Sequence, residues 1–204
     1  MSKEIYPVIL ALTGASGAQY ALRLLQCLVE ADVPVYLMVS KAAQIVLSME
    51  TELNVPARTA DMETFFTELY GAGKGQIKVY GQEQWTAPVA SGSHKASSMV
   101  VCPCTTGTLA AIANGNSDNL LERAADVMLK EKRQLIMVVR ETPFSQIHLE
   151  NMLRLSQAGA TIMPANPGFY NNPESLNDII DFMVSRILDH LKIENDLLPR
   201  WGED

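Results

Sequence analysis

The sequence has no apolar run near the roughly 20 residues that span a bilayer, and its opening MSKEIYP carries no export signal. Three cysteines are few and odd in number, which favours reduced thiols in the cytoplasm. Basic residues are scarcer than acidic ones, 16 against 23, and the net charge of −7 argues against a nucleic-acid surface. We therefore expect a soluble, cytoplasmic protein that binds neither membrane nor nucleic acid.

Several catalytic motifs are also missing from the chain. Cys102 and Cys104 form a C-x-C pair with no second pair and no nearby histidine, and the three histidines are scattered, so no zinc site is expected. There is no G-x-S-x-G elbow, no Walker A lysine and no aspartate-rich cluster for a magnesium-bound diphosphate. We expect no metal, and any anion must be held by a few placed cations.

The chain does contain alternating apolar strands and amphipathic helices. With 204 residues, 48% of them hydrophobic, one well-buried core is expected, so we interpret 1–204 as a single domain. Buried-type strands are predicted at 7–13, 33–39, 76–80, 98–104, 134–139 and 160–165, and helices at 17–30, 41–50, 61–71, 106–113, 119–131, 145–158 and 174–192. This alternation predicts a three-layer α/β/α fold, flavodoxin- or Rossmann-like, with a mainly parallel central sheet.

The first strand leads through TGASGA into a helix. Its glycines allow a tight turn, and the helix start offers N–H groups and a positive dipole end that suit a phosphate. The pattern is G-x-x-G rather than G-x-G-x-x-G, and the second strand ends in MVSK without an acidic residue. The missing ribose-binding carboxylate favours a mononucleotide over NAD. A turn that binds no ligand is the alternative on this feature alone.

Two further polar turns follow later strands. PCTTGTLAAIA, at 103–113, gathers threonine hydroxyls around a glycine at another helix start, and the turns after the first and fourth strands flank the crevice of a doubly wound sheet. This pairing favours FMN. Arg140 and Glu141 end the fifth strand at the same edge, where arginine can clamp a phosphate and a carboxylate can move protons.

Two helices carry charged residues beside their buried stripes. On the helix 119–131, Arg123 and Lys130 lie nearly opposite the stripe of Leu121, Ala124, Ala125 and Met128, either as a solvated face or as cations lent to a neighbouring subunit. On the helix 174–192, Arg186 lies at the margin of a core stripe predicted as Leu176, Ile179, Ile180, Met183, Ile187 and Leu191. The preceding turn, NPGFYNNP, contains Tyr170.

Taken together, TGASGAQYALRLL, VSKAAQ, PCTTGTLAAIA, NLLERAADVMLKEKRQLIMVVRETPFS, HLENMLRLSQAGATIMPA and PGFY resemble the flavin prenyltransferases, the UbiX-like enzymes. The resemblance runs through almost the whole chain. Wider relatives are flavin-dependent decarboxylases of cysteine-ended substrates, which share a flavodoxin-like sheet and carry a P-x-M-N-x-x-M-W element where this chain reads RETPFS. An arginine there suits a phosphate, whereas an amide suits an amide substrate, so the prenyltransferase is favoured.

The resemblance implies a set of binding residues. FMN would be held by Gly14, Ala15, Ser16, Ser40, Thr105, Thr106, Gly107, Thr108 and Arg140. Dimethylallyl monophosphate would be held by Tyr170, Arg186, Lys130 and Arg123, with Trp85 of the long loop 81–97 as an aromatic wall. Family members form large homo-oligomers, dodecamers, with sites at subunit junctions, and the tail at about 193–204 would pack on neighbouring subunits.

The implied reaction joins a dimethylallyl group to N5 and C6 of reduced FMN, with phosphate leaving. Glu141 is the first choice for proton transfer, Ser16 acts near N5, Glu50 is a weaker candidate for that relay, and Lys130 offsets phosphate charge. The prenylated FMN would serve a separate decarboxylase in ubiquinone biosynthesis or aromatic acid breakdown. The alternatives are an FMN-dependent cysteine-type decarboxylase and a non-catalytic flavin carrier.

Overall fold

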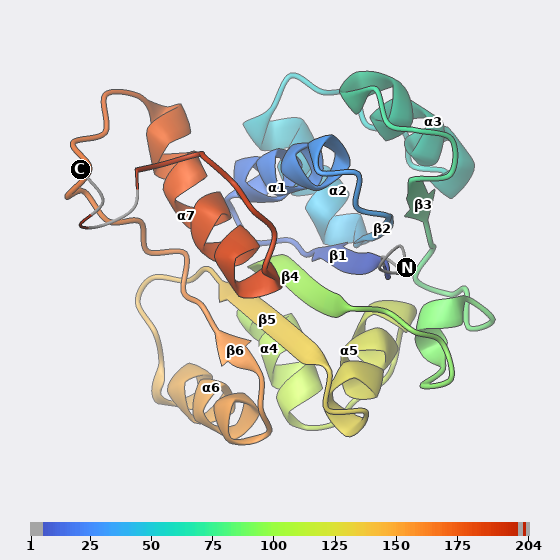
Figure 1. The fold of residues 1–204 in the computed structure, drawn as a ribbon. Helices are drawn as coiled ribbons and strands as arrows, with labels where there is room; N and C mark the ends of the chain where they lie inside the picture. Colours follow the sequence, from blue (N-terminus) through green and yellow to red (C-terminus); the bar gives the residue numbers. More distant parts are fainter. Residues whose placement is uncertain (1–5, 200–201, 203–204) are drawn as a thin grey trace.

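A computed structural model describes residues 6–199 and residue 202, and its centre is a six-stranded sheet (Figure 1). The order across the sheet is β3-β2-β1-β4-β5-β6, and every neighbouring pair is parallel. The strands are β1 (Val8–Leu12), β2 (Val35–Val39), β3 (Ile77–Val79), β4 (Ser98–Cys104), β5 (Gln134–Val139) and β6 (Thr161–Ile162). This is the Rossmann order, which confirms the predicted fold class.

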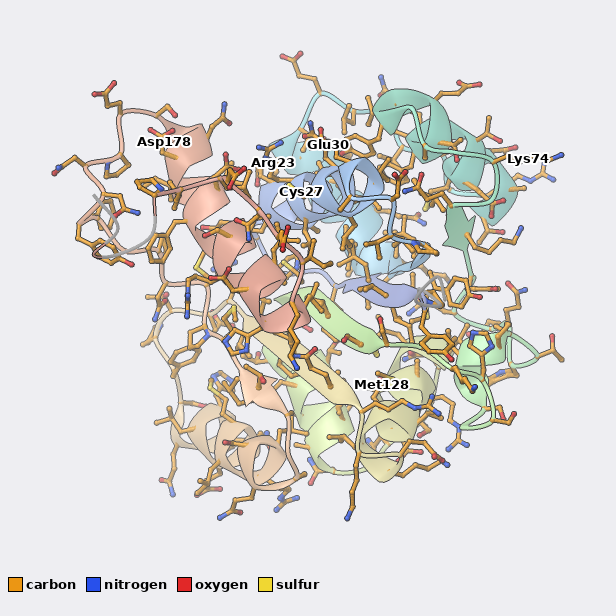
Figure 2. The ribbon with its side chains drawn as sticks, viewed as in Figure 1. Arg23, Cys27, Glu30, Lys74, Met128 and Asp178 are labelled. Atoms are coloured by element: carbon orange, nitrogen blue, oxygen red, sulfur yellow. The ribbon has the colours of Figure 1, made fainter. Side chains whose placement is uncertain are left out.

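Helices cover both faces of the sheet and complete the three layers. One layer holds α1 (Ala18–Glu30), α2 (Lys41–Glu50), α3 (Thr59–Tyr70) and α7 (Leu176–Leu191), and the other holds α4 (Thr106–Ala113), α5 (Leu120–Lys130) and α6 (Gln146–Gln157) (Figure 1). Cys27 on α1 and Met128 on α5 lie in opposite layers (Figure 2).

The apolar strand sequences explain this burial on two sides. Successive strand residues point to opposite faces, so Val8, Leu10 and Leu12 of β1 enter the core cluster beneath α1, α2, α3 and α7. Ile9 and Ala11 enter the cluster beneath α4, α5 and α6. A strand covered on both faces needs apolar residues at every position, which is what the VILAL run of β1 supplies.

The predicted elements are all present, with ends displaced by up to three residues, and two details differ. The loop 81–97 contains a short 3₁₀ helix, η1 (Pro88–Ala90). Leu176, predicted in the core stripe of α7, is 69% exposed, whereas Val184 and Leu188 are buried. The prediction for Leu176 was wrong because α7 begins there, so its first residue lines a pocket at the edge of the sheet instead of contacting the core.

The C-terminal segment begins by folding back on its own chain. Ile193 and Leu197 pack against the core cluster that α1 and α7 share. The tail predicted at 193–204 to contact neighbouring subunits falls partly outside the described residues, which exclude 200–201 and 203–204.

Within the described residues, no helix combines the length and apolarity needed to cross a bilayer. The same part of the chain contains no cluster of three or more histidine, cysteine, aspartate or glutamate side chains suited to a metal ion. All three cysteines are buried free thiols.

We expect Phe66→Ala to lower the free energy of unfolding by about 3–5 kcal/mol, because Phe66 anchors α3 on the core and truncation leaves a cavity. Phe66 is 1% exposed and stacks at 6.2 Å on Tyr70. Denaturant unfolding measures the loss. The matched control is the adjacent, half-buried Phe65→Ala, which should cost clearly less; equal losses would contradict the assigned anchor.

Candidate functional site

Four polar segments meet at the carboxyl edge of the sheet. Residues 14–17 follow β1, Ser40 follows β2, residues 105–108 follow β4 and Arg140 follows β5. Because β1 and β4 are neighbours whose following helices lie in opposite layers, their turns open a crevice between them (Figure 1). Ligands of doubly wound proteins bind at such a reversal of strand order.

The turn after β1 is packed too closely for a larger residue. A Cβ atom on Gly14 would lie 2.4 Å from Cβ of Ala42 in the first turn of α2. Gly17 has φ of 107°, a left-handed conformation that favours glycine. Ser40 N donates to Leu12 O at 3.0 Å, so α2 starts directly beside this turn. These contacts hold the first two strand ends together as one surface.

The start of α1 is occupied by a side chain of the same protein. Oε2 of Glu50, the last residue of α2, accepts hydrogen bonds from Gly17 N at 2.9 Å and Ala18 N at 3.0 Å. Gln19 Nε2 donates to Glu50 O at 3.0 Å and fixes the backbone there. A carboxylate of the protein itself therefore uses these two N–H groups and the positive end of the helix dipole, where the sequence predicted a phosphate.

The electrostatic balance at Glu50 keeps it ionised. Burial alone raises the pKa of Glu50, but hydrogen bonds from Ser16, Gly17 and Ala18 together with the positive charge of Arg140 outweigh burial. The net result is a pKa below the ordinary value of 4.5. Glu50 is thus a carboxylate at neutral pH, hydrogen-bonded to the hydroxyl of Ser16.

A pocket of about 450 Å³ joins these residues, a size usual for small-molecule sites. It is lined by Ser16, Gly17, Gln19, Tyr20, Glu50, Arg140, Ala165, Leu176 and Ile180. Nε of Arg140 is buried and has no hydrogen-bond partner among the described residues. An unpaired buried donor is costly, so this nitrogen is a point where a polar ligand gains a hydrogen bond.

The turn after β4 is ordered by its own threonines. Thr105 caps α4: its Oγ1 accepts from Thr108 N at 3.1 Å and donates to Thr108 Oγ1 at 3.0 Å. Gly107 is exposed at this helix start. Thr105 is in turn held by Thr13, a buried residue that sequence reasoning missed, although a hydroxyl ending an apolar strand was a visible signal.

Glu141 and Tyr170 lie in the segments beside the pocket. Glu141 directly follows Arg140, and its Oε1 accepts from Thr142 N at 3.0 Å. Tyr170 is 55% exposed, and its ring lies edge-on to Phe182 with 5.6 Å between centroids. Both remain predicted contacts of a second substrate.

The predicted residues of α5 and its neighbouring loop lie elsewhere. Lys130 ends α5 and pairs with Glu131 at 2.5 Å, while Arg123 pairs with Asp126 at 2.6 Å and donates to Ala90 O at 3.1 Å. Lys130 comes just before β5 and Arg140 just after it, so a strand of about 20 Å separates them. Within one chain, the structure does not bring Lys130 to the pocket.

Trp85 and Arg186 are likewise outside this pocket. Trp85 is 45% exposed and lies in the loop 81–97, which the hydrogen bond from Arg123 to Ala90 O attaches to α5. Arg186 is exposed on α7 and pairs with Asp189 at 3.0 Å. It lies ten residues beyond Leu176, which is about 15 Å along the helix axis.

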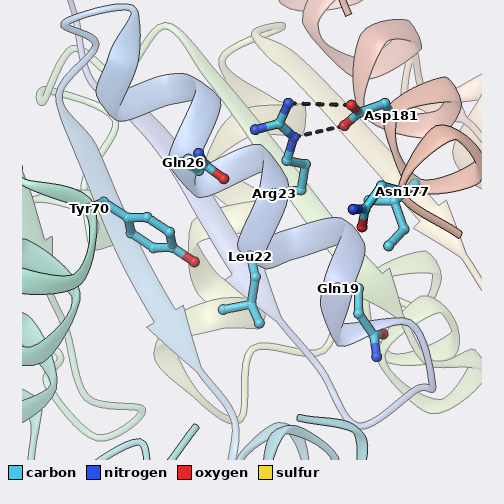
Figure 3. Close-up of a pocket in the computed structure, with 8 residues that line it drawn as sticks. Gln19, Leu22, Arg23, Gln26, Tyr70, Asn177 and Asp181 are labelled. Atoms are coloured by element: carbon cyan, nitrogen blue, oxygen red, sulfur yellow. Dashed lines mark hydrogen bonds and ion pairs between the residues drawn. The ribbon is translucent and has the colours of Figure 1, made fainter. Parts of the chain in front are cut away.

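A second hollow, of about 410 Å³, lies between α1 and α7 and shares Gln19 and Ile180 with the first (Figure 3). Its charged side chains neutralise each other, because Arg23 Nε bonds Asp181 Oδ1 at 2.7 Å and Arg23 Nη2 bonds Asp181 Oδ2 at 3.3 Å. A satisfied pair offers little to a ligand, so the pocket at the carboxyl edge is the better candidate.

Comparison with known proteins identifies the family of the chain. Residues 1–188 match the family described as Flavoprotein. The chain is 58% identical over 196 residues to a flavin prenyltransferase UbiX of Pseudomonas aeruginosa, covering 96% of this chain and 94% of that protein. It is 49% identical to the flavin prenyltransferase UbiX of Halalkalibacterium halodurans, covering 99% and 95%.

Solved structures show the same likeness. The crystal structure of AnUbiX in complex with FMN and dimethylallyl pyrophosphate matches with a TM-score of 0.86 and 38% identity, covering 98% of each chain. A dodecameric FMN-dependent UbiX-like decarboxylase from Escherichia coli O157:H7 matches with a TM-score of 0.84 and 39% identity, covering 96% and 99%.

The chain therefore belongs to the flavoprotein family. Within it, the chain is a member of the UbiX group of flavin prenyltransferases, as the resemblance implied.

We expect Glu50→Gln to destabilise the protein near neutral pH and to have little effect in acid. The lowered pKa of Glu50 means that its charge stabilises the fold above the unfolded pKa, and this contribution is lost as the pH falls through the folded pKa. Urea unfolding at about pH 7 and about pH 3.5 measures the change. Glu52→Gln, at an exposed position, is the control. A loss of stability in Glu50→Gln that is the same at both pH values would contradict the assignment.

Proposed function

We propose that this protein is a metal-independent flavin prenyltransferase. It transfers the dimethylallyl group of dimethylallyl monophosphate to N5 and C6 of reduced FMN and releases phosphate, so that prenylated FMN is the product. The observation that carries the proposal is the pocket at the strand-order reversal, where Ser16, Glu50 and Arg140 converge. The 58% identity to a flavin prenyltransferase over nearly the whole chain supports it.

The residues at the carboxyl edge fit FMN. Arg140 lines the pocket and has a buried Nε without a protein partner among the described residues, so a polar group of the flavin finds a donor there. Of the residues predicted to bind FMN, Ser16 and Arg140 line the pocket. The others follow strands at the same edge of the sheet: Gly14, Ala15, Ser40, Thr105, Thr106, Gly107 and Thr108. Because Glu50 occupies the start of α1, the start of α4 is the helix end left for phosphate.

Reduced FMN, when bound, supplies the nucleophilic ring atoms for the transfer. The chain's task is to place protons and charges around them. Ser16 lies at the pocket wall with its hydroxyl bonded to ionised Glu50, an arrangement that can orient or relay a proton at N5. Glu141, beside Arg140, is placed to exchange a proton with the phosphate or at C6.

The phosphate of the second substrate needs several positive charges, because no metal offsets the charge that develops as it leaves. Arg140 is in the pocket, and Tyr170 and Arg186 belong to the adjoining turn and α7. Lys130, Arg123 and Trp85 do not line this pocket in their own chain. They reach a site only if α5 and the loop 81–97 of one subunit face the carboxyl edge of another.

We therefore propose a homo-oligomer, a dodecamer, with sites at subunit junctions. A solved relative named as dodecameric supports this assembly, and AnUbiX, solved with FMN and dimethylallyl pyrophosphate, supports the two ligands. The product then leaves for a separate decarboxylase that uses prenylated FMN. The reaction takes place in the cytoplasm.

The decarboxylase and carrier alternatives are less favoured. Phosphopantothenoylcysteine-type structures match at 17% identity and share the fold alone. The segment RETPFS holds Arg140 where an amide-reading element would be needed. A plain carrier does not need three positive side chains besides Arg140, such as Lys130, Arg123 and Arg186.

We expect that FMN reduced anaerobically with this protein, then mixed with dimethylallyl monophosphate and no added magnesium, gains one C5H8 unit. Mass spectrometry of the released flavin measures it. The control omits the allylic phosphate and leaves the mass unchanged. Unmodified FMN, together with carbon dioxide release from a cysteine-ended substrate, would instead support the decarboxylase.

We expect two inactive variants to restore activity when mixed. Glu141→Gln damages the carboxyl-edge half of a site, and Lys130→Met damages the α5 half. If the two halves come from different subunits, mixtures that are dissociated and reassembled should regain roughly a quarter of the active sites. Prenylated flavin per subunit is the readout.

The control mixes Glu141→Gln with Arg140→Met, two changes on the same half. This mixture should stay inactive at every ratio. Restoration in the control, or none in the first mixture despite verified subunit exchange, would rule out a shared site.

A further inference from the structure

We propose that Thr13 is a positioning residue whose buried hydroxyl joins the two halves of the flavin site. It fixes the turn that starts α4 relative to the turn after β1, and so presets the crevice for FMN. The inference rests on the proposed function insofar as FMN is the ligand. Thr13 itself does not line the pocket, and its hydroxyl bonds Pro103 and Thr105.

The hydrogen bonds of Thr13 span the two strands that diverge. Thr13 is 3% exposed, its Oγ1 donates to Pro103 O at 2.7 Å, and the same oxygen accepts from Thr105 N at 2.8 Å. Thr13 N also donates to Pro103 O at 3.2 Å. One hydroxyl thus satisfies an acceptor near the end of β4, Pro103 O, and a donor just after the strand, Thr105 N.

This link lies where the regular sheet ends. Paired residues of β1 and β4 stop at Ala11 and Val101, and the pairing of β4 with β5 shifts between Val101 and Cys104. Beyond that irregularity the chain turns into α1 on one side and α4 on the other, and the backbone bond from Thr13 N to Pro103 O still joins the two strands there. The Thr13 hydroxyl extends this connection from Pro103 to Thr105, the residue that caps α4.

Thr13 acts on the ligand site through Thr105. Its N–H is held by Thr13, and its Oγ1 caps α4 through Thr108. On the other side, Thr13 is followed directly by Gly14, Ala15 and Ser16. Rotation of either turn would move hydroxyls and amides on one wall of the site but not the other. A preset geometry spares FMN the cost of ordering them.

The test compares three variants of the intact protein. Thr13→Val keeps the shape without the hydroxyl, and Thr13→Ser keeps the hydroxyl without the methyl group. Ser98→Ala removes an equally buried hydroxyl at the opposite end of β4, where Ser98 is 6% exposed and bonds Gln134 Oε1 at 2.8 Å. The readouts are the Kd for FMN by flavin fluorescence and the Tm without FMN.

We expect Thr13→Val to raise the Kd for FMN by about tenfold, because an unmade buried hydrogen bond leaves Thr105 N–H without its partner. Thr13→Ser should bind within about twofold of the unaltered protein. Ser98→Ala should lower the Tm and leave the Kd unchanged. Unchanged FMN affinity in Thr13→Val, or equal weakening in Ser98→Ala, would overturn the positioning role.

Amide hydrogen exchange keeps the inference testable if Thr13→Val does not fold. In the unaltered protein without FMN, Thr105 N–H should exchange much more slowly than the amide of the exposed Gly107. Equal exchange rates would overturn the inference. Failure of the unaltered protein to bind FMN would overturn the proposed function as well, whereas normal binding with an insensitive Thr13→Val would overturn the inference alone.

Discussion

The rest of the structure depends on the point where two neighbouring parallel strands, β1 and β4, diverge. β1 and β4 share a ladder through the core, and at its carboxyl end one chain turns to the layer of α1 and the other to the layer of α4. Close packing of Gly14 against Ala42 and the bonds of Thr13 to Pro103 and Thr105 keep this opening narrow and defined. The sheet thus provides a rigid floor and two fixed walls without any dedicated binding domain.

The two charged side chains at this opening, Glu50 and Arg140, differ in their hydrogen bonding. The carboxylate of Glu50 is satisfied by backbone N–H groups of the protein itself, while Arg140 keeps a buried donor without a protein partner among the described residues. The arginine still stabilises the glutamate through space. A ligand with electron-rich oxygen or nitrogen atoms therefore gains from Arg140 without competing for the groups that hold Glu50, so binding and proton handling are assigned to different residues.

Sequence reasoning predicted the fold because each buried strand is an unbroken apolar run, and strand order places the turns at one edge. It predicted Ser16 and Arg140 at that edge, where the structure has them, since Ser16 lies in the turn after β1 and Arg140 directly follows β5. It could not see that Glu50 reaches the start of α1, because that contact joins residues 33 apart. It misjudged Leu176, since helical periodicity does not reveal where a helix passes the edge of the sheet. The resemblance assigned Lys130 to the site, but in its own chain Lys130 precedes β5 and is separated from the carboxyl edge by that strand, about 20 Å long.

The irregularity in β4 also decides the chemistry of its two thiols. Residues two apart on a regular strand share a face, yet Cys102 packs in the cluster beneath α1 and Cys104 in the cluster beneath α4. Burial raises the pKa of both thiols, so neither forms a thiolate at neutral pH. The sheet lies between the two thiols. The two sulfurs of β4 are thereby kept in separate clusters and protonated, close to the edge where the flavoprotein pocket opens.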